Sequence, residues 1–373
     1  MKILLVNWLD HGNPQGGGAE IHLFELFSRL AGWGHQVRLV CSGWHGGAAR
    51  QLVEGIDVTR VSTRYGFVLA GRRAVRRALA EETPDIVVED INKVPLFVGN
   101  LTDRPLCAIV PHLFGATAFQ EAAWPMAAAV WLAERPLARA YARAGFHAIS
   151  QSTRDDLVAR GVRPECIRVI YPGVDSEHFT PDPGVARTDP PSFLYVGRLR
   201  RYKGVDIAIR ALARARARRS DIRLDIAGTG DTRPTLERLA RELGVADAVT
   251  FHGFVTEARK VALLRATWAN IFPSPKEGWG ITVMEAAACG TPSLASDSPG
   301  LQDSVRHGQT GYLVPHGDAD ALAERMLELA GDAALTARLG AAARAFAETL
   351  TWDRAARETE RHLEDIINGS ACG

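Results

Sequence analysis

The sequence predicts an α/β protein built from two doubly wound, Rossmann-like domains. Its 373 residues are enough for two domains of about 100–200 residues each. Short aliphatic runs bounded by glycine or proline alternate with amphipathic helical stretches, which is typical of parallel sheets with crossover helices. A proline-rich segment without apolar periodicity interrupts this alternation near the middle of the chain.

The first domain is expected to span residues 1–180. Runs of aliphatic and β-branched residues predict its strands, and amphipathic stretches predict the helices that connect them. The strands are expected at 2–7, 36–41, 85–90, 106–111, 147–150 and 167–171, and the helices at 19–30, 72–82, 125–143 and 153–160. The prolines that follow, at 181–192, predict a linker.

The second domain is expected at 193–350, where the same alternation begins again. Its strands are expected at 193–196, 224–227, 249–251, 270–273, 293–295 and 311–314, and its helices at 205–218, 235–243 and 281–289. Residues 351–373 predict a C-terminal helix that could cross back to the first domain. Because doubly wound domains bind ligands at the carboxyl ends of their strands, a site is expected in a cleft where the two domains face each other.

The charge balance argues against nucleic acid as a partner. The chain carries 44 basic and 43 acidic side chains, for a net charge of +1. One helix, 71–82, gathers four arginines and could meet anionic lipid headgroups or an anionic acceptor, but a solvated helix face is favoured. Peripheral contact with the inner face of a membrane is therefore left open and is not favoured.

The cysteines and the apolar runs indicate a cytoplasmic protein. Five cysteines are scattered without a C-x-x-C pair or a metal-type spacing, which fits a reducing compartment. The uncharged stretches, 122–133 among them, are shorter than the roughly 20 residues that span a bilayer. No transmembrane segment is expected.

A glycine cluster, Gly16–Gly18, lies between the first expected strand and the first helix. Backbone amides at Gly17 and Gly18 could approach an anion or a sugar closely at this position, and a simple tight turn is equally compatible with the sequence. The cluster is neither G-x-G-x-x-G nor a P-loop, which weakens a nicotinamide dehydrogenase.

Basic side chains follow the first strand of the second domain. The strand ends at Gly197, and Arg198 and Lys203 come before the next helix. A guanidinium fork and an ammonium group near a helix N-terminus suit a diphosphate, while a solvated basic turn is the alternative.

The segment 272–292 carries the most specific pattern. Glu277 precedes a turn of Gly278, Trp279 and Gly280, and a helix opens at Ile281 and Thr282. Backbone amides at the start of that helix could face a phosphate, and Glu277 could meet hydroxyl groups. Glu285, one turn inside the helix, could accept hydrogen bonds from both hydroxyls of a ribose.

Together these motifs resemble the retaining glycosyltransferases of family 4, also called glycosyl transferases group 1. The resemblance rests on the pair Glu277 and Glu285, the G-R-L-x-x-x-K-G segment at 197–204, the G-G-A-E loop at 17–20 and the G-x-T-G-x-L-V segment at 308–314. Their order and spacing extend over essentially the whole chain. One departure is I-Y-P-G-V-D at 170–175, where the family usually has P-N-G-V-D.

The resemblance implies a GT-B architecture, with an acceptor-binding first domain and a second domain that binds a nucleoside diphosphate sugar, most often UDP- or GDP-linked. It implies transfer of a hexose-type sugar to a hydroxyl group with retention by front-face displacement, without a metal or cofactor. Arg198 and Lys203 would neutralise the diphosphate, Glu277 would contact the sugar and Glu285 the ribose. Two further contacts are implied. His112 would lie near the anomeric carbon, and the base would meet Phe254 and Val255.

Several alternatives stay open. A nucleotide-sugar epimerase of the same architecture would isomerise the donor without an acceptor, and a non-catalytic binding protein would only hold it. A pyridoxal phosphate-dependent phosphorylase would need a Schiff-base lysine, for which Lys276 is near enough. The sugar, the base, the oligomeric state and the acceptor, whether glycan, lipid-linked or small molecule, are not predicted, although 112–134 is expected to border the acceptor.

Overall fold

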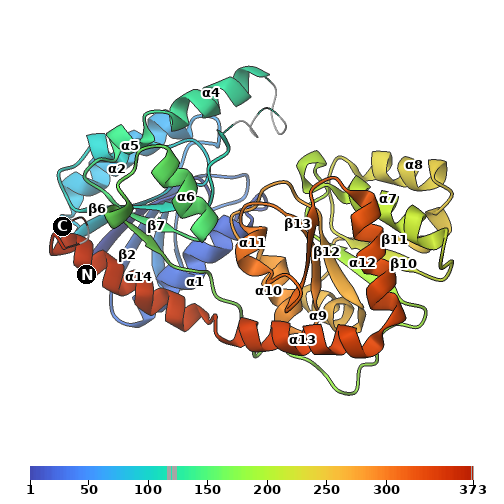
Figure 1. The fold of residues 1–373 in the computed structure, drawn as a ribbon. Helices are drawn as coiled ribbons and strands as arrows, with labels where there is room; N and C mark the ends of the chain where they lie inside the picture. Colours follow the sequence, from blue (N-terminus) through green and yellow to red (C-terminus); the bar gives the residue numbers. More distant parts are fainter. Residues whose placement is uncertain (116–118, 120–123, 371, 373) are drawn as a thin grey trace. The chain divides into compact units, whose positions relative to one another are not determined.

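The computed structural model describes residues 1–115, 119, 124–370 and 372. The chain forms two compact units, which are coloured along the sequence in Figure 1. Unit 1 consists of Met1–Pro172 together with Trp352–Gly373, and unit 2 consists of Gly173–Thr351. The last helix therefore belongs to unit 1.

Unit 1 is built on a sheet of eight strands in the order β3-β4-β2-β1-β5-β6-β7-β8. All neighbouring strands are parallel except β3 and β4, an antiparallel pair that the sequence did not predict. β3 is short and mostly exposed, and β4, with the sequence I-D-V-T-R-V, alternates between buried and half-buried positions instead of forming a continuous apolar run. The strands are β1 (Lys2–Val6), β2 (Gln36–Ser42), β3 (Arg50–Val53), β4 (Ile56–Val61), β5 (Ile86–Asp90), β6 (Leu106–Val110), β7 (Gly145–Ala148) and β8 (Ile167–Val169).

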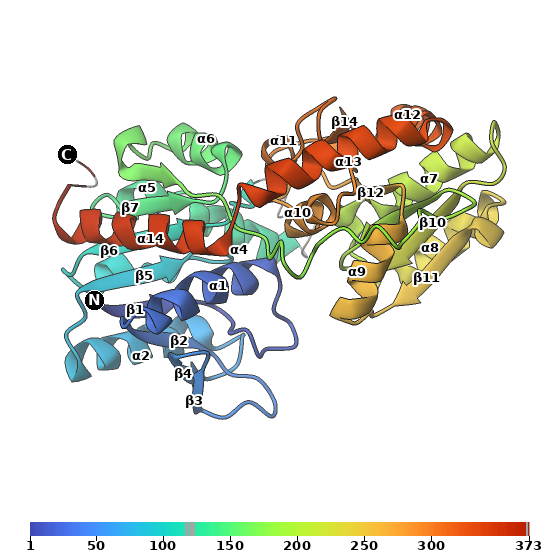
Figure 2. The ribbon, with the colours of Figure 1, turned by 90° about the horizontal axis from the view of Figure 1, so that it is seen from below.

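Alternate residues of these strands enter two separate cores, one on each face of the sheet. Leu4 and Val6 pack on one face, and Ile3 and Leu5 pack on the other. Helices cover both faces (Figure 2), as expected for a buried parallel sheet. They are α1 (Gly18–Gly32), α2 (Phe67–Glu81), α4 (Trp124–Glu134), α5 (Leu137–Ala140), α6 (Gln151–Ala159) and α14 (Trp352–Ile367), with 3-10 turns η1 (Val98–Asn100) and η3 (Pro164–Cys166).

One expected helix of unit 1 is divided in two. Residues 125–143 were expected to be continuous, but α4 ends at Glu134 and α5 begins at Leu137. Pro136 lies between them, and it interrupts the helix because proline lacks an amide hydrogen and its ring disturbs the preceding turn. The last helix, α14, shares the core of α1 and is also joined to it by an ion pair of 2.6 Å between Arg29 and Asp353.

Unit 2 has a fully parallel sheet of six strands in the order β11-β10-β9-β12-β13-β14. The strands are β9 (Ser192–Val196), β10 (Arg223–Ala227), β11 (Val249–Gly253), β12 (Ala269–Phe272), β13 (Ser293–Asp297) and β14 (Gly311–Pro315). The helices are α7 (Val205–Arg216), α8 (Arg233–Glu242), α9 (Glu257–Ala266), α10 (Ile281–Ala288), α11 (Leu301–Ser304), α12 (Ala319–Gly331) and α13 (Ala333–Glu348), with 3-10 turns η4 (Arg201–Lys203) and η5 (Ala246–Ala248).

The proline-rich segment 181–192, expected as a linker, lies within unit 2. Its side chains and backbone bind the unit directly. Arg187 donates to the carbonyl oxygen of Gly290 at 3.0 Å, and the amide of Thr188 donates to the carbonyl of Ala266 at 2.9 Å. Arg265 donates in turn to the carbonyl of Thr180 at 2.7 Å. The proline-rich composition predicted a linker, and these hydrogen bonds join the segment and the residue before it to unit 2.

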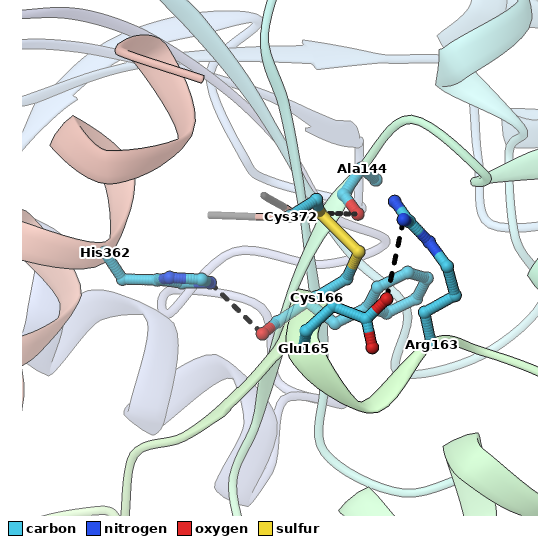
Figure 3. Close-up of a disulfide and its surroundings, with 7 residues drawn as sticks. Ala144, Arg163, Glu165, Cys166, His362 and Cys372 are labelled. Atoms are coloured by element: carbon cyan, nitrogen blue, oxygen red, sulfur yellow. Dashed lines mark hydrogen bonds and ion pairs between the residues drawn. A yellow bond between two sulfur atoms is a disulfide. The ribbon is translucent and has the colours of Figure 1, made fainter. Parts of the chain in front are cut away.

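Two cysteines are joined, although their spacing predicts no pair. Cys166, at the end of η3, forms a disulfide with Cys372 near the chain terminus (Figure 3). The bond links positions 206 residues apart in the sequence, a pairing that only folding could create. Among the described residues, the free cysteines Cys41, Cys107 and Cys289 are all buried.

Candidate functional site

The loops of interest in unit 2 leave two neighbouring strands at the centre of its sheet. The chain adds β10 and β11 on one side of β9, and β12, β13 and β14 on the other. The loops after β9 and β12 therefore diverge at the topological switch point, where doubly wound sheets bind ligands. The first loop carries Arg198 and Lys203, and the second carries Glu277.

The loop after β9 is held against the loop after β12 by close backbone packing. Gly204 begins α7 with a φ of +67°, in the left-handed region. A Cβ atom at this position would lie 2.3 Å from the carbonyl oxygen of Pro273, so a larger residue would push the loops apart. At the other end of the loop, the hydroxyl of Tyr195 donates to the carbonyl of Arg198 at 2.9 Å.

Lys203 and Glu277 form an ion pair between these two loops. The Nζ atom of Lys203 lies 2.5 Å from Oε1 of Glu277, and the exposed fractions of the two side chains are 13% and 14%. The amide of Glu277 donates to the carbonyl of Pro299 at 3.1 Å, which anchors the backbone of this loop. Arg198 is exposed and forms no ion pair with any residue that the structure describes, so its guanidinium can bind an anion.

The helix α10 begins beside this ion pair. Its first residue, Ile281, follows Gly280, which has a φ of +90°, and no side chain caps the helix. Ile281 and Thr282 are half-buried, so the N-terminus is not covered. Uncapped amides and the helix dipole attract anions. The start of α10 and the cations of the β9 loop thus combine two features that suit a diphosphate.

Glu285 lies one turn into α10 and pairs with a residue that the sequence analysis did not select. Its Oε1 accepts a hydrogen bond of 2.9 Å from Nζ of Lys260 on α9. Burial raises the pKa of Glu285 even though Lys260 acts in the opposite direction. Burial acts to lower the pKa of Lys260, but Glu285 and Glu257 outweigh it, and that pKa is raised.

The remaining expected donor contacts of unit 2 differ in exposure. Phe254 and Val255 follow β11, two strands away from β9, and the side chain of Phe254 is 83% exposed. The indole of Trp279, by contrast, is only 2% exposed and packs inside the unit. Gly278 and Gly280 flank this indole in the sequence, so the turn is anchored by its tryptophan.

Unit 1 holds the other expected site residues at the carboxyl edge of its sheet. Gly17 caps α1, and its amide donates to Oε2 of Glu20 at 2.7 Å. His112 follows β6, with its ring 4.8 Å from that of Phe114. In the segment expected to border the acceptor, residues 116–118 and 120–123 lie outside the described part of the chain.

The described residues contain neither a candidate metal cluster nor a helix that could span a membrane. No group of three or more His, Cys, Asp or Glu side chains could hold a metal ion in this part of the chain. None of its helices is long and apolar enough to cross a bilayer. On α2, Arg72 donates to the carbonyl of Phe97 at 3.1 Å and Arg77 pairs with Glu81 at 2.6 Å, so two of the four arginines are engaged within unit 1.

Comparison with known families identifies the chain. The family model "Glycosyltransferase Family 4" matches residues 16–178, and "Glycosyl transferases group 1" matches 178–346. The chain belongs to the family 4 glycosyltransferases. The two matches follow each other along this glycosyltransferase and contain all the glycine, basic and glutamate motifs described above.

Curated relatives of this family 4 glycosyltransferase are 34–39% identical to it over the stretches that align, which cover somewhat more than half of this chain. The D-inositol 3-phosphate glycosyltransferase of Streptomyces bingchenggensis is 34% identical over 239 residues, covering 59% of this chain and 52% of the relative. That of Acidothermus cellulolyticus is 39% identical over 209 residues, covering 52% and 46%. The chain thus spans about half the length of the curated relatives it matches.

Solved structures show the same GT-B fold. Sucrose-phosphate synthase from Thermosynechococcus elongatus matches with a TM-score of 0.83 at 23% identity, over 99% of this chain and 100% of that one. Anabaena HepE, in complex with UDP-glucose, matches with a TM-score of 0.79 at 21% identity, over 98% and 100%. These likenesses establish the two α/β units as the fold of this glycosyltransferase.

Proposed function

We propose that this family 4 glycosyltransferase moves a hexose-type sugar from a nucleoside diphosphate donor, UDP- or GDP-linked, to an acceptor hydroxyl group, with retention and without a metal ion. The observation that carries the proposal is the cluster at the switch point of unit 2. There Lys203 pairs with Glu277, Arg198 lies in the same loop as Lys203, and α10 begins four residues after Glu277 without a side-chain cap. The complex of Anabaena HepE with UDP-glucose supports a UDP-linked donor.

The chemistry of transfer follows from these groups. As the bond between the sugar and the diphosphate breaks, negative charge builds on the leaving phosphate and positive charge builds at the anomeric carbon. Arg198, Lys203 and the amides of α10 stabilise the leaving group from fixed positions, which is the role that a metal ion fills in other enzymes. Lys203 reaches the diphosphate by exchanging its partner Glu277, whose carboxylate then accepts hydrogen bonds from the sugar hydroxyls.

Other residues complete the proposed site. Glu285 accepts hydrogen bonds from the ribose, and the ammonium of Lys260 opposes the rise in the pKa of Glu285 that burial causes. Phe254 and Val255 meet the base, while Gly17, Gly18 and His112 contribute from unit 1. Retention of configuration is carried over from the family, and front-face displacement is its proposed route. In that route the acceptor hydroxyl attacks the anomeric carbon as its proton passes to the departing phosphate oxygen.

The proposal is tested with Lys203→Ala, Glu277→Gln and Glu285→Gln, assayed for turnover of UDP- and GDP-hexoses and for binding of UDP and uridine. We expect Lys203→Ala to reduce turnover by about 10²–10³-fold, the usual effect of removing one electrostatic donor. It should weaken the binding of UDP and leave the binding of uridine unchanged, because uridine lacks the diphosphate. Glu285→Gln should weaken the binding of both, because both contain the ribose.

Arg200→Ala is the matched control, because Arg200 lies in the same loop but is exposed and pairs with Asp231. It should turn over donor like the wild type, and all variants should unfold at similar temperatures. Near-normal turnover in folded Lys203→Ala and Glu277→Gln proteins would contradict the proposal. Formation of an isomerised donor sugar without any acceptor would instead indicate an epimerase. We expect glycosyl transfer to continue when a chelator has removed metal ions.

A further inference from the structure

A polar network in unit 1 lies at the second topological switch point of the molecule. The strands β1 and β5 are neighbours, with β2, β3 and β4 on one side and β6, β7 and β8 on the other. Asn7 follows β1 and Asp90 ends β5, and the two strands are in register with Val6 opposite Glu89. This is the edge at which a doubly wound domain binds its ligand.

The network is centred on the amide of Asn92. Its Nδ2 atom lies 2.9 Å from Oδ1 of Asn7, 3.1 Å from Oε1 of Glu20 and 3.3 Å from Oδ2 of Asp90. All three neighbours are acceptors in this arrangement, so the orientation of the amide is fixed with its nitrogen toward them. Its oxygen, Oδ1, therefore faces away from the network.

Two oxygens of this network have no donor. Oδ1 of Asp90 and Oδ1 of Asn92 are buried, and neither accepts a hydrogen bond from any described residue. Their residues are only 2% and 5% exposed. The other members are saturated, because Glu20 also receives the amide of Gly17 and the ammonium of Lys93, and Oδ1 of Asn7 also receives the amide of Trp8.

Leaving two buried acceptors unpaired costs stability, so a fold that keeps both of them in residues that contact each other is expected to use them. Burial raises the pKa of Asp90 well above its ordinary range, and Glu20 adds to this. Burial lowers the pKa of Lys93, whose other charged neighbours are Glu20 and Arg64. The groups that lack partners are oxygens, and oxygens call for a ligand that donates hydrogen bonds.

We propose that Asp90 and Asn92 bind the hydroxyl groups of an uncharged polyol ring, a sugar or a cyclitol, which is the part of the acceptor that unit 1 recognises. A hydroxyl group can donate to each unpaired oxygen, whereas a phosphate dianion has no hydrogen to donate to them. The identification of this ligand as the acceptor rests on the proposed glycosyl transfer. The proposal that a polyol binds at these two residues is independent of that function.

The decisive variant is Asp90→Asn. The amide of Asn92 needs an acceptor where Oδ2 of Asp90 now lies, so the new side chain keeps its oxygen there and places its NH2 group at the position of Oδ1. The size is unchanged, but a hydrogen-bond acceptor has become a donor. Asn92→Ala removes the second acceptor independently. Glu89→Gln is the matched control on the same strand, because Glu89 is bound by Tyr141 and by the amides of Leu96 and Val98.

Binding is measured by ligand-observed NMR on the full chain saturated with UDP, using myo-inositol and the methyl α-glycosides of glucose, mannose and galactose as probes. At least one probe should bind the wild type, and both Asp90→Asn and Asn92→Ala should raise its Kd at least tenfold. Glu89→Gln should leave this Kd within twofold. Inorganic phosphate should not displace the bound polyol.

The proposal is overturned if no probe binds the wild type, if phosphate displaces the polyol, or if the folded variants bind it as the wild type does. Thermal unfolding and the Kd for UDP are measured for every variant, and Asn92→Ala decides if Asp90→Asn fails to fold. These controls separate the two proposals. If UDP fails to bind the wild type, that result counts against the proposed donor site only. The polyol measurement is then repeated without UDP and tests the polyol site independently.

Discussion

At the scale of single residues, the donor site depends on atoms that are held by unusual backbone positions. Lys203 reaches Glu277 because the intervening loops touch at Gly204 and Pro273. A side chain at Gly204 would meet a carbonyl oxygen and would also occupy the left-handed region, which disfavours every residue with a Cβ. The ion pair between Lys203 and Glu277 therefore depends on glycine at position 204.

We predict that Gly204→Ala lowers the free energy of unfolding by about 2–4 kcal/mol, the sum of left-handed strain and displacement of the Pro273 carbonyl. Gly244→Ala is the matched control, since Gly244 has a φ of +69° and a Cβ atom there would have no neighbour within 4 Å. It should cost only about 1–2 kcal/mol. Urea unfolding measures both, and equal losses would show that the contact with Pro273 is unimportant.

At the scale of elements, three histidines join α1, β7 and α14 inside unit 1. The rings of His22 and His147 are 5.4 Å apart, and His362 binds the carbonyl of Phe146 at 3.1 Å. Burial lowers the pKa of His22 to about 4 and that of His362 to about 4. Burial also lowers the pKa of His147 well below its ordinary value. The packing of α14 thus requires neutral imidazoles.

We predict that unit 1 loses stability as the pH falls from about 6.5 to 4. Between pH 6.5 and 4 the histidines of the folded protein stay neutral, whereas those of the unfolded chain take up protons. The free energy of unfolding is therefore highest above pH 6.5 and falls as the pH approaches the pKa values of the folded state. The change from 6.5 to about 4, at about 1.4 kcal/mol per pH unit, is about 3 kcal/mol for each of His22 and His362. Denaturant unfolding at each pH measures it, and His22→Leu should flatten the curve. Equal slopes in both proteins would contradict this explanation.

At the scale of the whole molecule, each unit has cores of its own. Unit 1 has one on each face of its eight-stranded sheet, and the large core of unit 2 surrounds its six-stranded sheet. The proposed donor contacts belong mostly to unit 2, and the proposed polyol contacts belong to unit 1. Ligands for the two sites should therefore protect different parts of the chain.

We predict that UDP slows hydrogen exchange first in 197–204 and 277–288 of unit 2. A concentration of 100 times its Kd stabilises the binding state by about 2.7 kcal/mol. Exchange measured by mass spectrometry with and without UDP should show this protection, and UMP, which lacks the second phosphate, should protect 197–204 less. Protection confined to unit 1 would contradict the assignment of the diphosphate to Arg198, Lys203 and α10.

The agreement between sequence and structure differs from element to element. The buried parallel strands were predicted because they are short, apolar and bounded by glycine or proline, as at Lys2–Val6 and Ser192–Val196. The pair β3 and β4 was missed because β3 is mostly exposed and because Asp57, Thr59 and Arg60 interrupt the apolar residues of β4. The fixed proline-rich segment was taken for a linker because its hydrogen bonds go to residues far along the chain, such as Gly290.

The sequence by itself determined the α/β class, the family, and the motifs that hold Arg198, Lys203, Glu277 and Glu285, since these depend on local periodicity and short spacings. Only the tertiary structure decided their partners. Lys203 pairs with a residue 74 positions away, Lys260 with one 25 positions away, and Asn92 with one 85 positions away. The first and third pairs form where loops at the carboxyl ends of parallel strands meet, and the second joins helices α9 and α10. Strand order and helix packing are properties of the folded domain that no local pattern contains.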